Sequence, residues 1–95
     1  MLLEMFPQDI RFVGNGGLWL ETPDGRHHNP DFKVKDQKKI IEVFGSPFHK
    51  PPEEAQIIAD YAAIGWKCLV IWAKMFQSAP KRAVLRPIVE AFIQS

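Results

Sequence analysis

Two carboxylate residues stand in short segments whose composition is typical of β-strands. Asp31 opens the segment 31–34, and Glu42 lies inside the apolar segment 39–44. A histidine, His49, follows soon after the second segment. Hydrolysis of a phosphodiester bond requires a hard divalent cation, an activated water and stabilisation of the phosphate charge. Carboxylates followed by a histidine therefore indicate a candidate metal-dependent phosphodiesterase site.

The turn between the two segments predicts where the carboxylates lie. A polar turn centred near Asp36-Gln37 pairs the segments as antiparallel strands and places Asp31 opposite Glu42. Opposed residues bring their Cβ atoms to about 5 Å on one face of a sheet. Two like charges at this separation repel, and a Mg²⁺ ion, with Mn²⁺ as substitute, resolves the repulsion. The Val43 carbonyl is the next available ligand along the strand.

Each candidate also has a structural interpretation. Asp31, after Pro30, could cap a turn, and Glu42 could face solvent on an edge strand. His49 could be a surface loop residue; in a catalytic role it would activate the water, protonate the leaving oxygen or contact the phosphate.

Two further acids, Glu53 and Glu54, stand in the first turn of a helix expected from Pro51 to about residue 64. Acids at this position ordinarily stabilise the helix N-terminus. In a catalytic role, one of them would hydrogen-bond to His49 or to a water on the metal.

The remaining reactive or aromatic residues are assigned to structural roles. His27 and His28 are expected in an exposed polar turn, and with Cys68 they lack the spacing of a zinc site. Cys68 stands in an apolar run as a buried small residue, and a single cysteine fits a reducing compartment. Trp19 is expected to pack in the core, with stacking on a nucleic-acid base as the alternative.

The first half of the chain predicts an antiparallel meander. The segment 10–13 alternates as a strand, residues 15–17 form a hairpin turn signal, and the segment 18–21 returns as its partner. The segments 31–34 and 39–44 continue the meander.

The second half predicts a helix, a strand and a second helix. The apolar segment 66–72 is expected to be a central strand covered on both faces, and the intervening helix favours a parallel crossover. The fold class is therefore α/β (α+β), with a mixed four- to five-stranded sheet flanked by helices. The last helix is expected to bury one apolar stripe, namely Val84, Leu85, Ile88, Val89 and Phe92.

Composition and charge limit the remaining possibilities. The chain of 95 residues is expected to form one domain, 1–95. A hydrophobic fraction of 46% indicates a packed core, yet no segment reaches the ~20 apolar residues of a membrane span, so we expect a cytoplasmic, intracellular protein without a membrane partner. A net charge of +1 is a weak signature for nucleic-acid binding, which suggests that a DNA-recognition region lies elsewhere.

Three ordered motifs resemble the very-short-patch-repair-like endonucleases, most nearly the phage homing endonucleases called the EDxHD group. That family belongs to the PD-(D/E)xK nuclease superfamily and cuts DNA with magnesium. The resemblance extends from Phe12 to the last helix and implies a Mg²⁺-dependent DNA endonuclease with double-stranded DNA as its partner. The motifs are Asn29-Pro30-Asp31-Phe32, then Ile41-Glu42-Val43-Phe44-Gly45 with Phe48-His49, and finally Gly65-Trp66-Lys67-Cys68-Leu69-Val70-Ile71-Trp72.

The resemblance assigns roles to individual residues. It implies that Asp31 is the metal-binding aspartate, that Glu42 is the second acid and that Val43 supplies a carbonyl ligand. His49 matches the histidine of the group's name.

Other positions match the family less closely. Glu54 stands near the family's final acid, with Asp60 as the alternative. Phe44 occupies the place of the superfamily's lysine, so proton transfer is expected to fall to His49. The family's leading glutamate is either Glu4 or part of an upstream helix segment that this chain lacks.

Two other functions are compatible with the sequence. A mismatch-repair-type very-short-patch endonuclease would share the chemistry, whereas a non-catalytic nuclease-fold module would bind DNA or a protein partner. The target sequence, nicking as opposed to double-strand cleavage, and the oligomeric state, a dimer included, are not determined by the sequence.

Overall fold

A computed structural model describes residues 2–45 and 50–95. Its elements are α1 (Leu2–Met5), β1 (Ile10–Phe12), β2 (Leu20–Glu21), β3 (His27–His28), β4 (Phe32–Val34), β5 (Lys39–Phe44), α2 (Pro51–Ala62), β6 (Lys67–Trp72), the 3₁₀ helix η1 (Ala73–Phe76) and α3 (Ala79–Gln94).

A mixed four-stranded sheet with the order β1-β4-β5-β6 lies at the centre of the fold. β4 pairs antiparallel with both β1 and β5, whereas β5 and β6 run parallel and are connected through α2. β2 and β3 form a separate two-stranded hairpin. The predicted α+β class, with a mixed sheet, flanking helices and a parallel crossover, is therefore confirmed.

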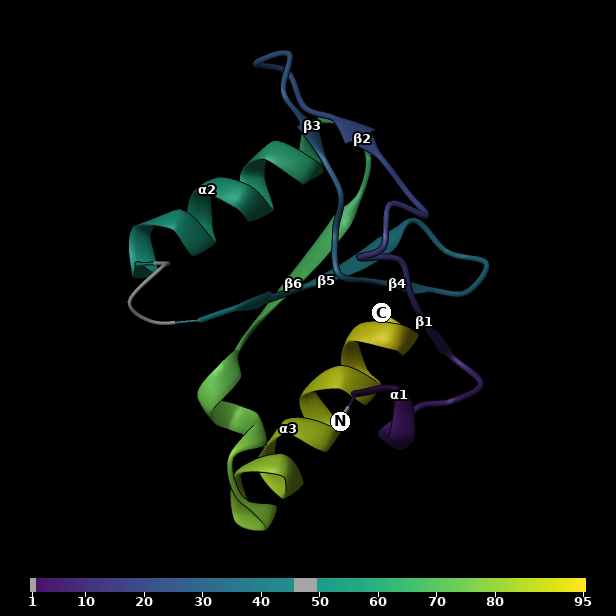
Figure 1. The fold of residues 1–95 in the computed structure, drawn as a ribbon, viewed down its shortest axis with the longest axis vertical. Coiled ribbons are helices and arrows are strands. Elements are labelled where there is room, and N and C mark those ends of the chain that lie inside the picture. The colour runs from purple at the N-terminus through teal and green to yellow at the C-terminus, as the bar shows by residue number, and fades with distance from the viewer. Residues whose placement is uncertain (1, 46–49) are drawn as a thin grey trace.

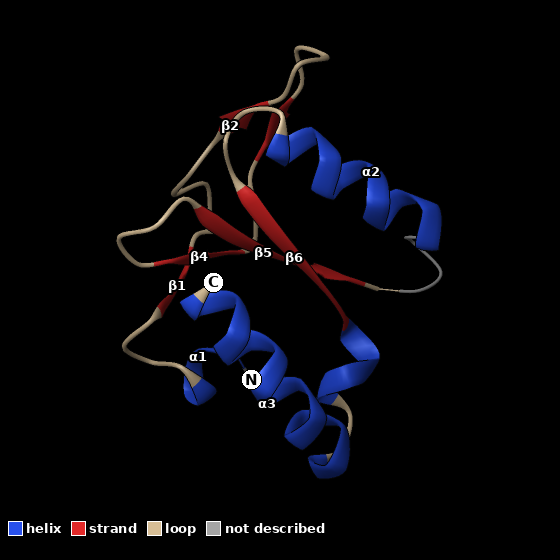
Figure 2. Cartoon of the chain, turned by 180° about the vertical axis from the view of Figure 1, so that it is seen from behind, coloured by secondary structure: helices blue, strands red, loops and turns tan. Residues whose placement is uncertain are grey.

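Helices cover both faces of the sheet, with α2 on one side and α1 with α3 on the other (Figures 1 and 2). Successive β5 side chains point to opposite faces. Ile41 accordingly packs with Leu85 beneath α3, while Ile40 packs with Tyr61 beneath α2. Glu42 shares the face of Ile40, so the second carboxylate looks toward α2, as its position in the strand predicts.

The strand pairing in the first half of the chain differs from the predicted meander. β1 pairs with β4, and β2 pairs instead with β3 through the turn after Thr22. Residues 15–17 form a loop that the Asn29 side chain braces, because its Nδ2 donates to the carbonyls of Val13 and Leu18 at 2.6 and 2.7 Å. A contact between residues distant in sequence therefore overrides the local hairpin signal.

The sequence predicts a central strand at residues 66–72, whereas β6 lies at the edge of the described sheet. The predicted cover on both faces is confirmed, because Cys68 packs beneath α2 and Ile71 packs with the α3 cluster. The central positions belong to β4, which begins directly after Asp31, and β5, which contains Glu42.

Three apolar side chains that the sequence predicts to be buried are exposed. Trp19 is 60% exposed, and on α3 Val84 and Ile88 are 58% and 45% exposed. α3 packs on a single sheet face, so only the narrower stripe through Leu85 and Val89 is buried. Among the described residues, no helix is long and apolar enough to cross a membrane.

Candidate functional site

Hydrogen bonds from two neighbouring segments fix Asp31 just before β4. Its backbone carbonyl accepts from the N–H groups of Val13 and Gly14 at 2.9 and 3.0 Å. Its side-chain Oδ2 accepts from the N–H of Val43 at 2.8 Å. Asp31 therefore joins the end of β1 to β5, and its carboxylate lies against the strand that carries Glu42.

Pro30 explains why the Asp31 side chain, and not a backbone carbonyl, accepts the hydrogen bond from the Val43 N–H. The pairing of Phe32 with Ile41, extended by two residues, places Pro30 opposite Val43. Proline has no N–H to offer the Val43 carbonyl, and the Asp31 carboxylate has replaced a backbone acceptor for the Val43 N–H. In a β-strand, the N–H and the C=O of one residue point toward the same neighbouring strand. Because the Val43 N–H points toward Asp31, the Val43 carbonyl faces that side as well.

Glu42 is a half-buried carboxylate that accepts a hydrogen bond from α2. The Tyr61 hydroxyl donates to its Oε1 at 3.1 Å. The pKa of Glu42 is raised from 4.5 to about 7, chiefly by burial and also by the charge of Asp31, while the Tyr61 hydrogen bond opposes the rise. The register of Phe32 with Ile41, extended by one residue, places Asp31 opposite Glu42, as predicted.

This donor set fits a hard divalent cation. Asp31 and Glu42 each carry a second oxygen besides the one that accepts a protein hydrogen bond. Magnesium commonly takes one or two carboxylates and keeps several waters, so it needs no full protein cage. Within residues 2–45 and 50–95, no three His, Cys, Asp or Glu side chains are grouped to hold a metal ion. A site here would therefore rest on two carboxylates and the Val43 carbonyl.

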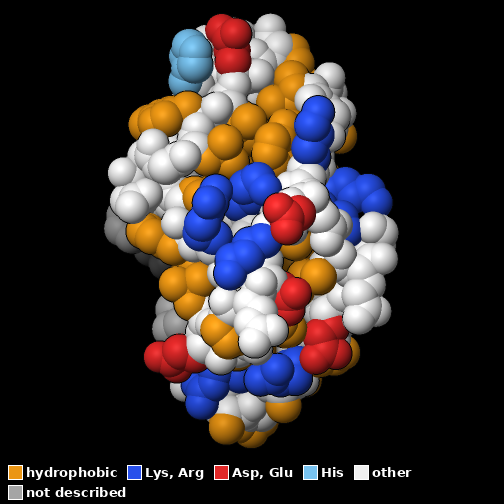
Figure 3. Space-filling view, turned by 90° about the vertical axis from the view of Figure 1, so that its right-hand side faces the viewer, with side chains coloured by type: hydrophobic (Ala, Val, Ile, Leu, Met, Phe, Trp, Pro, Cys, Tyr) orange, Lys and Arg blue, Asp and Glu red, His pale blue; other side chains and the backbone are white. Residues whose placement is uncertain are grey.

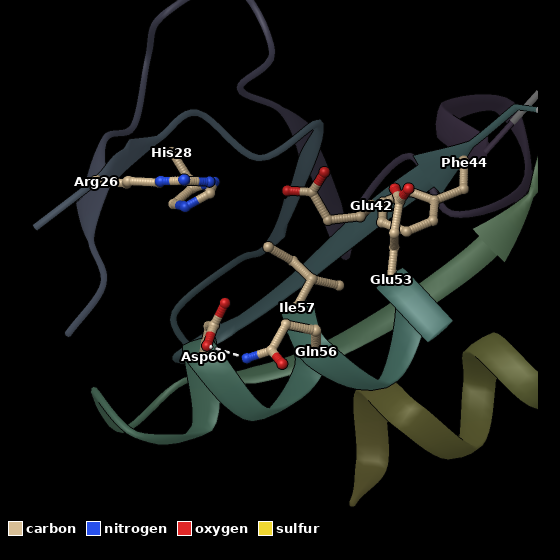
Figure 4. A pocket seen from close by; sticks show the side chains of 8 residues that line it. All are labelled: Arg26, His28, Glu42, Phe44, Glu53, Gln56, Ile57 and Asp60. Atoms are coloured by element: carbon tan, nitrogen blue, oxygen red, sulfur yellow. Dashed lines mark hydrogen bonds between the residues drawn. The ribbon is translucent and has the colours of Figure 1, made fainter. Parts of the chain in front are cut away.

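A cleft of about 360 Å³ opens beside Glu42, between β5, α2 and the β2–β3 hairpin. Figure 4 shows Glu42 and Phe44 on the β5 side, Glu53 and Asp60 on α2, and His28 at the opposite end. Asp60 accepts a hydrogen bond from a neighbouring glutamine of α2 at 2.8 Å. The cleft thus collects several carboxylates around one opening.

The structure separates the two acids at the start of α2. Glu53 lines the cleft with Glu42, whereas the Glu54 carboxylate accepts a 2.6 Å hydrogen bond from the Trp72 indole N–H. Trp72 also packs edge-on against Phe44, with ring centroids 5.7 Å apart. Glu54, the acid that the resemblance assigns to the site, is thus hydrogen-bonded to Trp72 of β6, and Glu53 lines the cleft instead.

The structure bears on one of two other expected participants. His49 lies outside the described residues. Glu4 belongs to α1, which packs on the sheet face opposite Glu42. Phe44, at the position of the family's lysine, is 5% exposed and forms part of the cleft wall.

His28 and Tyr61 are site residues that the sequence did not reveal. The expected exposed turn at residues 27–28 is strand β3, and only His27 is exposed. The His28 ring lies edge-on to Tyr61, with centroids 5.8 Å apart. Tyr61 has the helical spacing of a core residue, and no local pattern distinguishes a core tyrosine from one that also binds a carboxylate.

Replacing Tyr61 by Phe is expected to raise the pKa of Glu42 above about 7. The variant loses the Tyr61 hydroxyl, which donates to Glu42, but keeps the ring. A neutral hydrogen bond of about 1 kcal/mol corresponds to a rise of about 0.5 to 1 in pKa. A ¹³C-carboxyl NMR titration measures it, and Trp72→Phe, which removes the donor to Glu54, is the control. A midpoint that stays or falls would show that the hydroxyl does not act on Glu42.

Comparisons with protein-family models, with curated proteins and with solved structures found no match to this chain. The functional argument therefore depends on the site itself.

Proposed function

We propose that this chain is the catalytic domain of a Mg²⁺-dependent DNA endonuclease of the homing type, with a PD-(D/E)xK fold. One observation carries the proposal: Asp31 and Glu42 lie opposite each other on one sheet face, and their mutual repulsion helps to keep Glu42 protonated near neutral pH. Two adjacent carboxylates repel each other as ions, and a cation between them removes that repulsion.

The chain's own residues would divide the work as follows. Asp31, Glu42 and the Val43 carbonyl would hold the cation against the end of β4. When bound, the ion supplies charge stabilisation for the phosphate and an activated water. The hydrogen bonds from Val43 and Tyr61 orient the two carboxylates, so each presents its second oxygen in a fixed direction.

Basic side chains on the same sheet face support a nucleic-acid substrate. Arg11 pairs directly with Lys33 across β1 and β4, and with Lys35 and the acidic Asp36 they line a depression. Like charges in opposed positions are unfavourable unless an anion lies over them. Figure 3 shows Lys and Arg side chains gathered on the side of the molecule that carries β1 and β4. Phosphates of double-stranded DNA are suitable anions for this surface.

One observation favours a second candidate, a non-catalytic module of the same fold. Glu54 and one oxygen each of Asp31 and Glu42 are engaged in hydrogen bonds that also serve the fold. Such a module would keep these bonds and the basic surface without cutting DNA. A mismatch-repair endonuclease would share the proposed chemistry and differ in its DNA target, and either enzyme would act in the cytoplasm of its host.

A cleavage assay with excess protein over supercoiled plasmid tests the proposal. We expect nicked or linear DNA in the presence of millimolar Mg²⁺ or Mn²⁺, and intact plasmid after the metal is removed with EDTA. Excess protein compensates for weak DNA affinity. Plasmid that stays intact, together with no heat of Mn²⁺ binding in calorimetry, would reject the nuclease and favour the non-catalytic module.

A further inference from the structure

The two edges of the central sheet differ in length and in charge. β1, at one edge, pairs over three residues, and Lys and Arg side chains gather on its side of the molecule (Figure 3). β6, at the other edge, pairs with β5 over six residues, and the five that follow Lys67 carry no charge. Short strands and charges are the usual protection of a sheet edge against pairing with another chain. β1 follows this pattern, whereas β6 does not.

Three residues of β6 direct their backbone polar groups toward the open edge. The N–H of Lys67 donates to the Lys38 carbonyl, so the backbone groups of Lys67 face the β5 side. Every second residue of a strand faces the same neighbouring strand. The N–H and carbonyl groups of Cys68, Val70 and Trp72 therefore point outward. Among the residues that the structure describes, no strand pairs with this edge.

α2 presents a small apolar flank beside β6. Glu54 accepts a hydrogen bond from Trp72, so this side of the helix lies over β6. Ile58 and Ala62 follow Glu54 at intervals of four residues and share its side of the helix. Ile58 is half-buried and Ala62 is exposed. The cleft with its carboxylates opens on the other flank of α2.

α3 presents larger apolar side chains on the same side of the molecule. The Phe92 ring lies 5.8 Å from the ammonium group of the first residue of β5, which pairs with the first residue of β6. Ile88 and Val84 precede Phe92 at intervals of four residues, and they are 45% and 58% exposed. On the other flank of α3, Arg86 lies over the phenyl ring that follows α1. The exposed apolar row of α3 therefore faces the β6 side.

The two helix flanks and the open edge between them form one apolar surface. We propose that a second copy of this chain covers this surface, through antiparallel pairing of the two β6 strands about a two-fold axis perpendicular to the sheet. In the register centred on Val70, each Val70 pairs with its own counterpart, and Cys68 pairs with Trp72 of the partner subunit. All three outward-facing residues then exchange backbone hydrogen bonds, and Lys67 stays outside the paired segment.

The symmetry of this arrangement favours a second copy over another partner. The axis brings each helix layer against its own counterpart, so the same patch must fit itself. Val84 then lies toward Ile88 of the partner subunit in an antiparallel helix pair, and Ala62 allows the two α2 helices to approach closely. Each charge in such a contact would meet its own copy, and the paired segment of β6 carries none. Lys67 and Lys81 flank the surface, as charges commonly surround an apolar interface.

Sedimentation equilibrium of the metal-free chain without DNA tests the proposal independently of the nuclease function. We expect a mass of twice 10.9 kDa at high protein concentration. Replacing Val84 and Ile88 together by Lys should weaken the association by at least about 100-fold, because two cations per subunit enter an apolar contact. Trp19→Lys is the matched control, since Trp19 is 60% exposed but lies beside Gly16 in the turn after β1. This variant should associate like the wild type.

Amide hydrogen exchange tests the strand pairing itself. The outward amides of Cys68, Val70 and Trp72 should exchange at least about tenfold more slowly in the wild type than in the double lysine variant. The Leu69 and Ile71 amides face β5 and should stay protected in both, which shows that the variant is folded.

Three results would overturn the proposal. A wild type that remains a monomer at every concentration excludes the second copy. A dimer that survives the double lysine substitution has its interface elsewhere. A monomer whose outward amides are nevertheless protected has this edge covered by another segment of its own chain.

Discussion

Asp31→Asn is expected to lower metal-dependent DNA cleavage by about 10³-fold, the effect of several kcal/mol lost from charge stabilisation. Asparagine keeps a side-chain oxygen that can accept the Val43 N–H, so the junction between β4 and β5 is preserved. The substitution removes one negative charge from the cation site. Loss of activity without loss of fold would distinguish a metal ligand from a residue that only caps a turn.

The same substitution has a second expected effect, on Glu42. Burial and the charge of Asp31 both raise the pKa of Glu42, so that pKa should fall below about 7 in the variant while burial keeps it above 4.5. Cleavage of supercoiled plasmid measures the first effect, and carboxyl NMR measures the second. Asp36→Asn is the control, because Asp36 is an exposed turn residue with a φ of 61° that asparagine also accepts. Cleavage retained by Asp31→Asn would refute the metal site.

The unfolding free energy of the metal-free wild type is expected to fall as the pH rises from about 4.5 to 7. Glu42 has a pKa of about 7 in the fold against an ordinary value of 4.5, so folding favours its protonated form. Its contribution is fully present below the unfolded pKa and is lost as the pH passes the folded one. The fall should amount to up to about 3 kcal/mol.

Glu42→Gln should remove this dependence and make the metal-free chain more stable at pH 8 by up to about 3 kcal/mol. Glutamine is neutral at every pH and can still accept from the Tyr61 hydroxyl. Urea unfolding followed by tryptophan fluorescence measures the difference. Glu90→Gln, at an exposed position on α3, should retain the wild-type curve. A Glu42→Gln curve that falls as steeply as the wild type would contradict the assignment.

Metal addition completes this comparison. Mg²⁺ should stabilise the wild type at pH 8, since a ligand that binds only the folded state adds its binding free energy. Glu42→Gln should gain less, because it has lost a charged ligand. A stability gain from removing the carboxylate, combined with a loss of metal response, would indicate that Glu42 is retained for binding rather than for folding.

The carboxylate pairing could be predicted because it depends on local features. A short polar turn fixes the register between residues 31–34 and 39–44, and a period of two fixes the face that each side chain shares. The same local logic failed at residues 15–17. There the Asn29 side chain, distant in sequence, holds the loop and directs β1 to β4.

The sequence alone determined the mixed sheet, the helix layers and the opposition of Asp31 and Glu42, because strand period, turn length and helical spacing act over short distances. Only the tertiary structure decided which other groups join them. The crossover through α2 brings Tyr61 and Glu53 over β5, while Trp72 engages Glu54.

His28 is the clearest case of this division. Its burial depends on a hairpin folding back onto a helix more than twenty residues away, and no nearby residue type signals that contact. Side-chain partners across elements are set by packing of the whole chain, which is why sequence patterns locate the two carboxylates and leave their surroundings undetermined.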